Sequence, residues 1–304
     1  MQRSYDKSSL PPLSLIQKVE KKMKHEDNPK SIKYYMKQFF LREKLRFKGK
    51  RILDFPAGSG VTSNILKSIG AIPLPYDLFP EFFKVKNLTC LKADINKGIP
   101  LENQSVDAIV SQEGIEHFEN QLKALHEFNR VLKVGGSLII TTPNYSNMVG
   151  RLSYFLSENE LFNKQMPQNE LNDIWVTKQE TSTDIYYGHL FLIGINKLRL
   201  LAKISGFRIK NIENTRVKTS AVILLVLFYP FILLSNWRSY KRCLRRNKKV
   251  SMKIKKEVYG EIFKLATTPR LLVNSHIFVE FEKEFSTEDA KCNLTGSQQE
   301  LNAT

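Results

Sequence analysis

An acidic residue followed by two closely spaced glycines is the first feature of this 304-residue chain that could support chemistry. Residues 54–60 read DFPAGSG and lie between an apolar run and a helical stretch, 62–69. Glycine lets a backbone approach a ligand closely, because no side chain intervenes and a positive φ costs little. The third glycine of a dinucleotide fingerprint and the Gly-Lys-Ser/Thr of a phosphate loop are both missing. The turn therefore disfavours a pyrophosphate, and Asp54 favours a cationic ligand.

A second group of reactive side chains follows a later apolar run. Residues 111–117 read SQEGIEH, and they include Glu116 and His117. An imidazole titrates near neutral pH, so His117 is a candidate general base. The alternative is that Glu116 and His117 cap and pack the following helix.

These groups must be positioned by alternating strands and helices. Short apolar runs predict five strands, at 51–55, 71–74, 88–91, 106–110 and 137–141. Amphipathic stretches between them indicate βαβ units, so we expect an α/β, Rossmann-like, doubly wound sheet. Ligands of such sheets bind at the carboxyl ends of the strands. A helix at 196–205 and strands at 207–212 and 276–281 complete the predicted core.

Changes in amino-acid composition along the chain predict its domain organisation. We expect an N-terminal helical cap (1–50), a core (51–218) with a polar, irregular acceptor-side insertion (144–188), and a hydrophobic and basic insertion (219–270). A final core strand (271–285) and a disordered tail (286–304) follow.

Composition limits the cellular context. Three scattered cysteines suggest neither disulfides nor zinc, and no secretory signal is recognised at the N-terminus, so we expect a cytoplasmic protein. The net charge of +17 requires an anionic partner, which composition alone does not identify. The sequence leaves the oligomeric state open.

The ordered motifs resemble class I S-adenosylmethionine-dependent methyltransferases, types 11 and 23 among them. Asp54, Gly58 and Gly60 match the first motif of that family, Asp-x-x-x-Gly-x-Gly, and the resemblance covers residues 50 to 143. Asp107 and the residues LKVGG at 132–136 match later motifs. Pro56 and Ala57 depart from the usual residues of the turn, and Val134 replaces a proline.

The resemblance implies S-adenosylmethionine as the cofactor and names the residues that hold it. Asp77 at the end of the second strand would accept hydrogen bonds from both ribose hydroxyls, and Asp94 with Ile95 would flank the adenine. The full implied set is Asp54, Pro56, Ala57, Gly58, Gly60, Asp77, Leu78, Asp94, Ile95 and Gln112.

Similarity also bears on the acceptor side. Glu113, Glu116 and His117 resemble the Glu-x-x-Glu-His stretch of ubiquinone-biosynthesis O-methyltransferases, where a divalent metal is associated with it. We expect no metal here and keep that trio as the alternative set of ligands. His189, which follows two tyrosines and a glycine, resembles a histidine over the acceptor pocket of small-molecule methyltransferases; a core histidine is the other interpretation. The predicted catalytic residues are thus His117, Glu116 and His189.

A charge-free run of fourteen residues, 221–234, interrupts the core pattern. It is short for a membrane span and contains Pro230, so an interfacial or re-entrant element is predicted. Trp237 and Tyr240 suit the headgroup level, and the basic run from Arg238 to Lys256 would attract an anionic leaflet. The alternative is a helix buried in the core beside a solvated basic helix.

The leading hypothesis is O-methylation of a lipophilic or lipid-linked small molecule by a peripherally or monotopically membrane-associated enzyme. One alternative is an RNA-directed methyltransferase that uses the basic surface. It is disfavoured because 111–114 lacks the Asn/Asp-Pro-Pro-Tyr motif of base methyltransferases, so nucleic acid is not the expected partner. The other alternative is a non-catalytic membrane-binding protein with a vestigial cofactor pocket.

Overall fold

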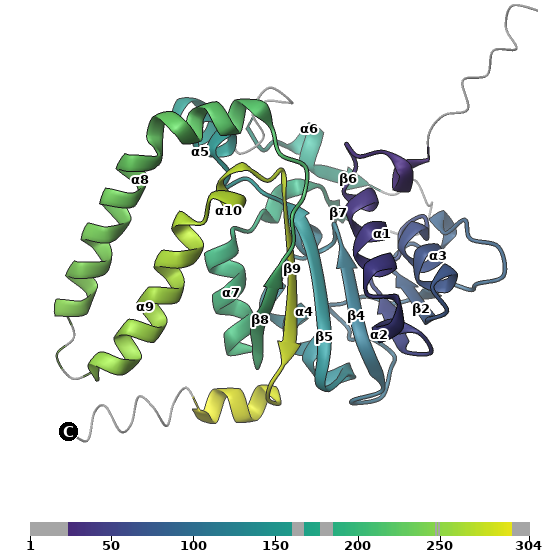
Figure 1. The fold of residues 1–304 in the computed structure, drawn as a ribbon. Helices are drawn as coiled ribbons and strands as arrows, with labels where there is room; N and C mark the ends of the chain where they lie inside the picture. The colour runs from purple at the N-terminus through teal and green to yellow at the C-terminus, as the bar shows by residue number, and fades with distance from the viewer. Residues whose placement is uncertain (1–23, 160–166, 177–184, 247, 249, 294–304) are drawn as a thin grey trace, which may run out of the picture.

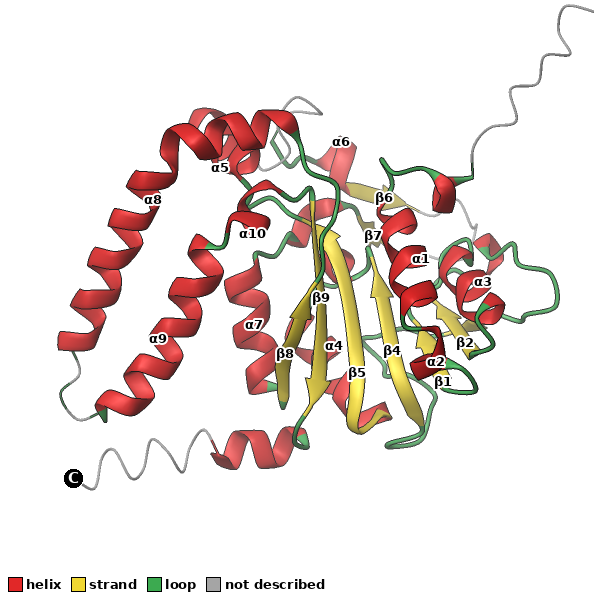
Figure 2. Cartoon of the chain, viewed as in Figure 1, coloured by secondary structure: helices red, strands yellow, loops and turns green. Residues whose placement is uncertain are grey.

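The computed structural model describes residues 24–159, 167–176, 185–246, 248 and 250–293. Seven strands of this part form one sheet, in the order β3-β2-β1-β4-β5-β9-β8. Their bounds are β1 Arg51–Asp54, β2 Ile72–Asp77, β3 Leu91–Lys92, β4 Val106–Gln112, β5 Leu132–Pro143, β8 Phe207–Ile212 and β9 His276–Lys283. A separate hairpin pairs β6 Ile174–Val176 with β7 Ile185–Tyr187. Figure 2 shows the sheet in yellow between layers of helix.

Helices of the described residues cover the sheet and extend to one side of it. They are α1 Ile32–Arg42, α2 Lys44–Phe47, α3 Val61–Ser68, α4 Gln121–Val131, α5 Met148–Ser157, α6 Glu170–Asp173, α7 Ile195–Ile204, α8 Thr219–Arg245, α9 Met252–Thr267 and α10 Pro269–Val273, and residues 287–293 are helical as well. Single 3-10 turns are η3 His25–Asp27, η4 Pro80–Phe82, η5 Ile115–His117 and η6 His189–Phe191. Figure 1 shows α8 and α9 as a pair that projects away from the sheet.

Strand directions confirm the doubly wound α/β prediction. The strands β1 to β5 pair in parallel, and β9 pairs antiparallel with both β5 and β8. The strand β8 therefore points the same way as β5. The carboxyl ends of β1, β2, β4, β5 and β8 consequently share one edge of the sheet, where open α/β folds bind their ligands.

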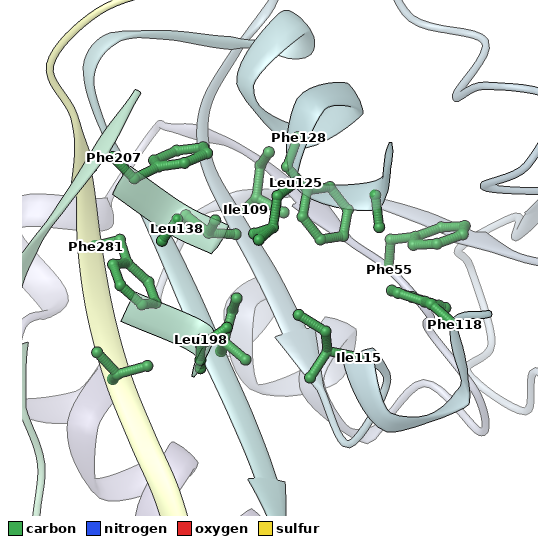
Figure 3. Packing of buried hydrophobic residues seen from close by; sticks show 14 of the residues in the cluster. Phe55, Ile109, Ile115, Phe118, Leu125, Phe128, Leu138, Leu198, Phe207 and Phe281 are labelled. Atoms are coloured by element: carbon green, nitrogen blue, oxygen red, sulfur yellow. The ribbon is translucent and has the colours of Figure 1, made fainter. Parts of the chain in front are cut away.

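Alternating side chains divide the core into two layers. Leu53, Ile109 and Leu138 pack on one face of the sheet with Phe128 of α4 and Leu198 of α7. Figure 3 shows this layer, including Phe55 and Phe118 beside it. The neighbouring residues along the strands point to the opposite face and meet α1 and α3: Ile52, Val110 and Ile139 contact Met36, Phe40 and Leu66. Such strict alternation with burial on both faces is what a sheet covered by helices requires.

The N-terminal helices occur where a cap was predicted. Ser31 begins α1 by accepting a hydrogen bond from the backbone N–H of Lys33, and Phe39 and Phe40 of α1 are buried. Residues 1–23 of the predicted cap lie outside the described residues.

Two segments differ from their predictions. The insertion 144–188 was expected to be irregular, yet it contains α5, whose N-cap Asn147 accepts a hydrogen bond from the N–H of Gly150. The tail was expected to be disordered, but residues 287–293 are helical, with Thr287 and Ala290 buried. Burial of these side chains stabilises a segment whose composition alone predicts no structure.

The apolar insertion forms a longer helix than its charge-free run of fourteen residues, and its predicted interfacial or re-entrant position stays a prediction. The helix α8 does not end at Pro230: it is 27 residues long and continues through the proline to Arg245. A proline inside a helix removes one backbone hydrogen bond and bends the axis, and α8 is visibly bent in Figure 1. Length and composition make α8 the one helix of the described residues that could cross a bilayer. Of its most apolar window only 6% is buried, so α8 is not the buried core helix of the alternative interpretation.

Candidate functional site

A cavity of about 1060 Å³ opens at the carboxyl edge of the sheet. Its walls come from the turn after β1, the end of β2, the turn at 94–96, the end of β4 and the β7 hairpin strand. Pockets for small ligands occupy roughly 300 to 1000 Å³. This cavity is therefore large enough for a nucleoside-sized cofactor with a second molecule beside it.

The glycine turn forms one end of the cavity. Gly58 and Gly60 have φ values of +50° and +83°, a region that favours glycine. A Cβ on Gly60 would lie 2.5 Å from Val85 and 2.6 Å from Phe83, so a side chain there has no room. The space beside Gly58 is open. The turn thus exposes its backbone to the cavity at Gly58, while the side chains of Phe83 and Val85 pack closely against Gly60.

Asp77 closes the same end. Its Oδ2 accepts a hydrogen bond from the N–H of Gly58 at 2.7 Å, and its Oδ1 accepts one from the N–H of Phe79 at 2.8 Å. The carboxylate is nearly buried, yet it lines the cavity. Each carboxylate oxygen has two lone pairs, so Asp77 retains acceptor capacity for hydroxyl groups while it holds the turn.

Asp54 lies behind the turn and is fully buried. Its Oδ2 accepts a hydrogen bond from the hydroxyl of Ser63 at 2.6 Å, while Oδ1 has no hydrogen-bond partner among the described residues. Burial, opposed in part by Ser63, raises the pKa of Asp54 to about 7. An orphaned buried carboxylate oxygen of this kind suits a cationic ligand, such as a sulfonium with an ammonium group, next to the turn.

This buried carboxylate predicts a gain of stability on neutralisation. Its pKa is higher in the folded chain than the ordinary 3.8, so stability falls as pH rises from about 4 to 7. Asp54→Asn should therefore raise the unfolding free energy of the ligand-free protein by about 1 to 3 kcal/mol at pH 8. The gain should shrink at pH 5. Thermal unfolding at both pH values measures it.

Asp107 provides the matched control. Burial alone would raise its pKa, but hydrogen bonds from Lys133 and the N–H of Arg51 lower it on balance. A lowered pKa means that the charged form is stabilising above the ordinary pKa. Asp107→Asn should thus lose stability at pH 8, with a sign opposite to Asp54→Asn. Equal losses for both variants would contradict the assigned cost of burying Asp54.

The remaining predicted cofactor residues fall into two groups. Pro56, Ala57, Leu78, Asp94, Ile95 and Gln112 line the cavity, whereas Asp54 and Gly60 lie in the layer behind it. Asp94 accepts a hydrogen bond from the N–H of Asn96 at 2.9 Å, and this turn presents Ile95 and Asn96 to the cavity. Together with Gly58 and Asp77, eight of the ten residues expected to hold S-adenosylmethionine thus line one cavity, and their role in binding it stays a prediction.

The three predicted catalytic residues converge but play different parts. Glu116, His117 and His189 each place one potential ligand atom within 4.8 Å of the others. Among these three, His117 lines the cavity, while Glu116 is fully buried. The Glu113 of the predicted metal trio is outside this group: its carboxylate lies 3.4 Å from His276 and accepts a hydrogen bond from Thr141.

The orientation of His117 follows from its neighbours. Its Nδ1 lies 2.7 Å from the carbonyl oxygen of Tyr187 and 2.8 Å from that of Gly188. Carbonyl oxygens only accept, so Nδ1 carries the proton and the neutral ring has its lone pair on Nε2. The ring stacks on Tyr186, with centroids 5.2 Å apart, and lies 5.4 Å from His189.

Glu116 supports this arrangement from the interior. Its Oε2 accepts a hydrogen bond from the hydroxyl of Thr142, and no residue in the described part of the chain hydrogen-bonds to its buried Oε1. Burial and the nearby charge of Glu113 raise the pKa of Glu116 well above its ordinary value. The raised pKa disfavours the charged form of Glu116, so we assign this side chain to support and not to proton removal.

Aromatic side chains that were not predicted from the sequence form a further wall of the cavity. Phe79, Phe82, Tyr186 and Tyr187 line it together with Phe118. The rings of Phe79 and Tyr186 pack edge to face at 5.5 Å. Ile32 and Lys33 of α1 add a further side. In the sequence, Phe79 and Phe82 follow shortly after Asp77, and Tyr186 and Tyr187 shortly precede His189. These aromatic residues could have been recognised there, but they follow no helical or strand period.

Comparison with known proteins agrees with the motifs. Residues 53–140 match a family model described as a methyltransferase domain, which confirms the resemblance over that segment. The ubiquinone biosynthesis O-methyltransferase of Xanthomonas campestris is 27% identical over 114 residues, 34% of this chain and 48% of that protein. The demethylmenaquinone methyltransferase of Chlorobaculum tepidum is 32% identical over 99 residues, 31% of this chain and 40% of that protein.

The chain thus spans about half the length, or less, of the curated relatives it matches. Among solved structures, a SAM-dependent methyltransferase from Archaeoglobus fulgidus is 16% identical, with a TM-score of 0.49 over 85% of this chain and 97% of that one.

Proposed function

We propose that this chain, with a methyltransferase domain at residues 53–140, transfers the methyl group of S-adenosylmethionine to an oxygen of a lipophilic or lipid-linked molecule at a membrane surface. One observation carries the proposal. A single cavity connects the glycine turn and Asp77 with His117 and an aromatic wall. Cofactor, base and acceptor would thereby share one enclosed space, which methyl transfer requires.

The cofactor end is assigned to the turn and its neighbours. Gly58 gives backbone access, Asp77 would accept hydrogen bonds from the ribose, and Ile95 would contact the base. Asp54 would balance the positive charge from behind. S-adenosylmethionine supplies a methyl group on a positively charged sulfur, ready for in-line displacement. The protein must therefore only align the acceptor and remove its proton.

His117 is the proposed base. A hydroxyl acceptor has to lose a proton as its oxygen attacks, and a positioned imidazole is suited to this at neutral pH. The carbonyls of Tyr187 and Gly188 hold Nδ1–H, which orients the ring in the cavity wall. Buried Glu116 and adjacent His189 are assigned to positioning that ring.

The acceptor class is argued from the cavity wall. Phe79, Phe82 and Tyr186 present apolar rings where the second molecule would lie. A flat or hydrophobic acceptor gains more from such a wall than a polar one does. The relatives named above are called ubiquinone biosynthesis O-methyltransferase and demethylmenaquinone methyltransferase, and a quinone-like ring belongs to the class proposed here.

Membrane association is supported by α8. The helix is long, apolar and largely exposed, and it ends in a basic segment. An acceptor that partitions into lipid is reached most directly by an enzyme on that lipid.

Calorimetric titration with S-adenosylmethionine tests the cofactor assignment. We expect a dissociation constant of roughly 1 µM to 1 mM, the range usual for enzyme substrates. NAD is the matched control ligand, because it carries an adenosine with a pyrophosphate that this turn does not suit. Absence of binding for S-adenosylmethionine, or equal binding of NAD, would refute the assignment.

Transfer itself is tested with methyl-tritiated S-adenosylmethionine. The protein is incubated with a membrane lipid extract from the organism that encodes it, and in parallel with its total RNA. We expect label in the organic phase of the lipid reaction. Label in RNA alone would replace the proposal by the RNA-directed alternative.

A further inference from the structure

The outward side of α8 is an uncovered apolar surface. The helix packs through Leu225, Tyr229 and Ile232 in a cluster with Met148 of α5 and Leu272 of α10. On its other side, Val226 and Phe231 are 73% and 67% exposed, and Ile223, Leu227 and Leu234 are exposed with them. No described residue covers these five side chains. A soluble monomer rarely leaves so many neighbouring large apolar groups in water.

The neighbouring helix α5 also exposes apolar side chains. It packs against α8 and exposes Phe155 to 84%, together with Tyr154 and Leu156. We give the name α5–α8 surface to eight of the exposed apolar residues of these two helices: Tyr154, Phe155, Leu156, Ile223, Val226, Leu227, Phe231 and Leu234. The helix α5 follows β5 and α8 follows β8, so both begin at the edge of the sheet where the cavity opens.

Positive charge borders the α5–α8 surface at one end. Beyond Leu234 the exposed side of α8 continues with Trp237, Arg238, Lys241, Arg242 and Arg245. The ammonium of Lys241 lies 5.8 Å from the centre of the Trp237 ring. The segment 219–245 contains no aspartate or glutamate. Apolar residues, then tryptophan, then cations is the order that matches acyl chains, headgroup region and anionic phosphate.

We infer that the α5–α8 surface and the basic end of α8 dock onto an anionic lipid leaflet, with α8 lying in the plane of the membrane and not across it. The neighbouring helix excludes a span. The hydroxyl of Tyr229 donates to the carbonyl oxygen of Thr267 at 3.1 Å, and Lys255 donates to that of Leu244 at 3.3 Å, so α9 follows α8 along its length.

The charged residues of α9 distinguish a helix α8 that lies in the membrane plane from one that spans the membrane. This helix carries Lys253, Lys255, Lys256, Glu257, Glu261 and Lys264 within 16 residues. Arg199 of α7 forms an ion pair with Glu261 at 2.5 Å, which ties α9 to the core. A spanning α8 would either take these charges into hydrocarbon or lose its partner helix, and both are costly. In-plane docking leaves α9 on the aqueous side.

Other occupants fit less well. In a parallel pair of chains the basic ends of two α8 helices would meet, and in an antiparallel pair Arg238 and Lys241 would face apolar residues. Nucleic acid would contact the basic end and leave the α5–α8 surface in water. An anionic lipid leaflet would contact both the α5–α8 surface and the basic end of α8. Resting on the proposed function, it also brings a lipophilic acceptor to the edge at which the cavity opens.

Flotation with vesicles tests the docking. The protein should float with vesicles of phosphatidylcholine and phosphatidylglycerol and much less with phosphatidylcholine alone. Val226→Asp with Phe231→Asp, and separately Phe155→Asp, should reduce retention about tenfold or more. Leu45→Asp is the matched control, because Leu45 is an apolar residue of α2 that is 90% exposed. Equal retention of all variants would overturn the inference.

Depth measurements test the orientation. Trp175→Phe leaves Trp237 as the single tryptophan, and a second protein combines Trp175→Phe, Trp237→Phe and Leu227→Trp. Lipids brominated at shallow or deep positions should quench both tryptophans from similar, shallow depths. In a spanning helix the two positions would differ in depth by about 15 Å. Deep quenching at position 227 alone would overturn in-plane docking.

Two further measurements distinguish a failure of the docking inference from a failure of the proposed function. S-adenosylmethionine binding by the flotation variants should be unchanged, because their substitutions lie outside the cavity. Failure of cofactor binding with intact flotation would refute the proposed function and leave the docking surface standing. Light scattering without vesicles that shows a dimer, lost in Val226→Asp with Phe231→Asp, would assign the surface to a second copy.

Discussion

Replacement of His117 by alanine should lower methyl transfer to the lipid extract about 10²- to 10⁴-fold, the range for loss of a general base. The imidazole lines the cavity, and its Nδ1 contacts the carbonyl oxygens of Tyr187 and Gly188. Alanine removes the only proposed proton acceptor at that wall. Initial rates of tritium transfer at saturating S-adenosylmethionine measure the loss, because they report the chemical step and not cofactor binding.

Two comparisons make this result specific. His126→Ala removes another histidine, which lies on α4 outside the cavity, and should keep the wild-type rate. Cofactor affinity of His117→Ala, measured by calorimetry, should stay near that of the wild type, because the proposed role of the ring is toward the acceptor and not toward the cofactor. A rate within about threefold of wild type would show that His117 is not the base.

Asp77→Ala should weaken S-adenosylmethionine binding by about 1.5 to 3 kcal/mol, the value of hydrogen bonds to a charged group. This corresponds to a roughly 10- to 150-fold higher dissociation constant. The substitution removes the acceptor for the ribose and also frees the N–H groups of Gly58 and Phe79, which Asp77 now holds. Both losses act on the same end of the cavity. Calorimetry with S-adenosylmethionine gives the change directly.

Asp107→Ala controls for the loss of any hydrogen-bonded aspartate. Its carboxylate accepts hydrogen bonds from the N–H of Arg51 and from Lys133, and it does not line the cavity. The variant should lose stability and keep its cofactor affinity. Unchanged affinity in Asp77→Ala, with both variants folded by circular dichroism, would remove Asp77 from the cofactor site.

Much of the central sheet was predictable from short apolar runs. β1, β4 and β8 begin where those runs begin, and Asp77 closes β2 as the motif requires. The strand β3 was predicted too early, since 88–91 was expected and Leu91–Lys92 pairs with β2. Its two residues are exposed, so no hydrophobic pattern marks them.

The insertions were less predictable, for identifiable reasons. A proline inside an apolar run usually ends a helix, but α8 continues through Pro230 because contacts of Tyr229 and Ile232 with neighbouring helices support both sides of it. Likewise α5 lies in a polar, asparagine-rich segment whose composition suggests a loop. Its apolar residues Phe155 and Leu156 face outward, so core packing does not explain them.

The sequence by itself determined the glycine turn, the order of carboxylates along the strands and the alternation of the core, because turn geometry and side-chain periodicity are local properties. Only the tertiary structure decided that His117 lines the cavity while Glu116 is buried. The same holds for His189, which takes the place of Glu113 in the cluster whose potential ligand atoms lie within 4.8 Å of one another. The tertiary structure also decided that α8 is exposed and paired with a charged helix. These outcomes depend on how distant segments pack, and a linear pattern does not contain that information.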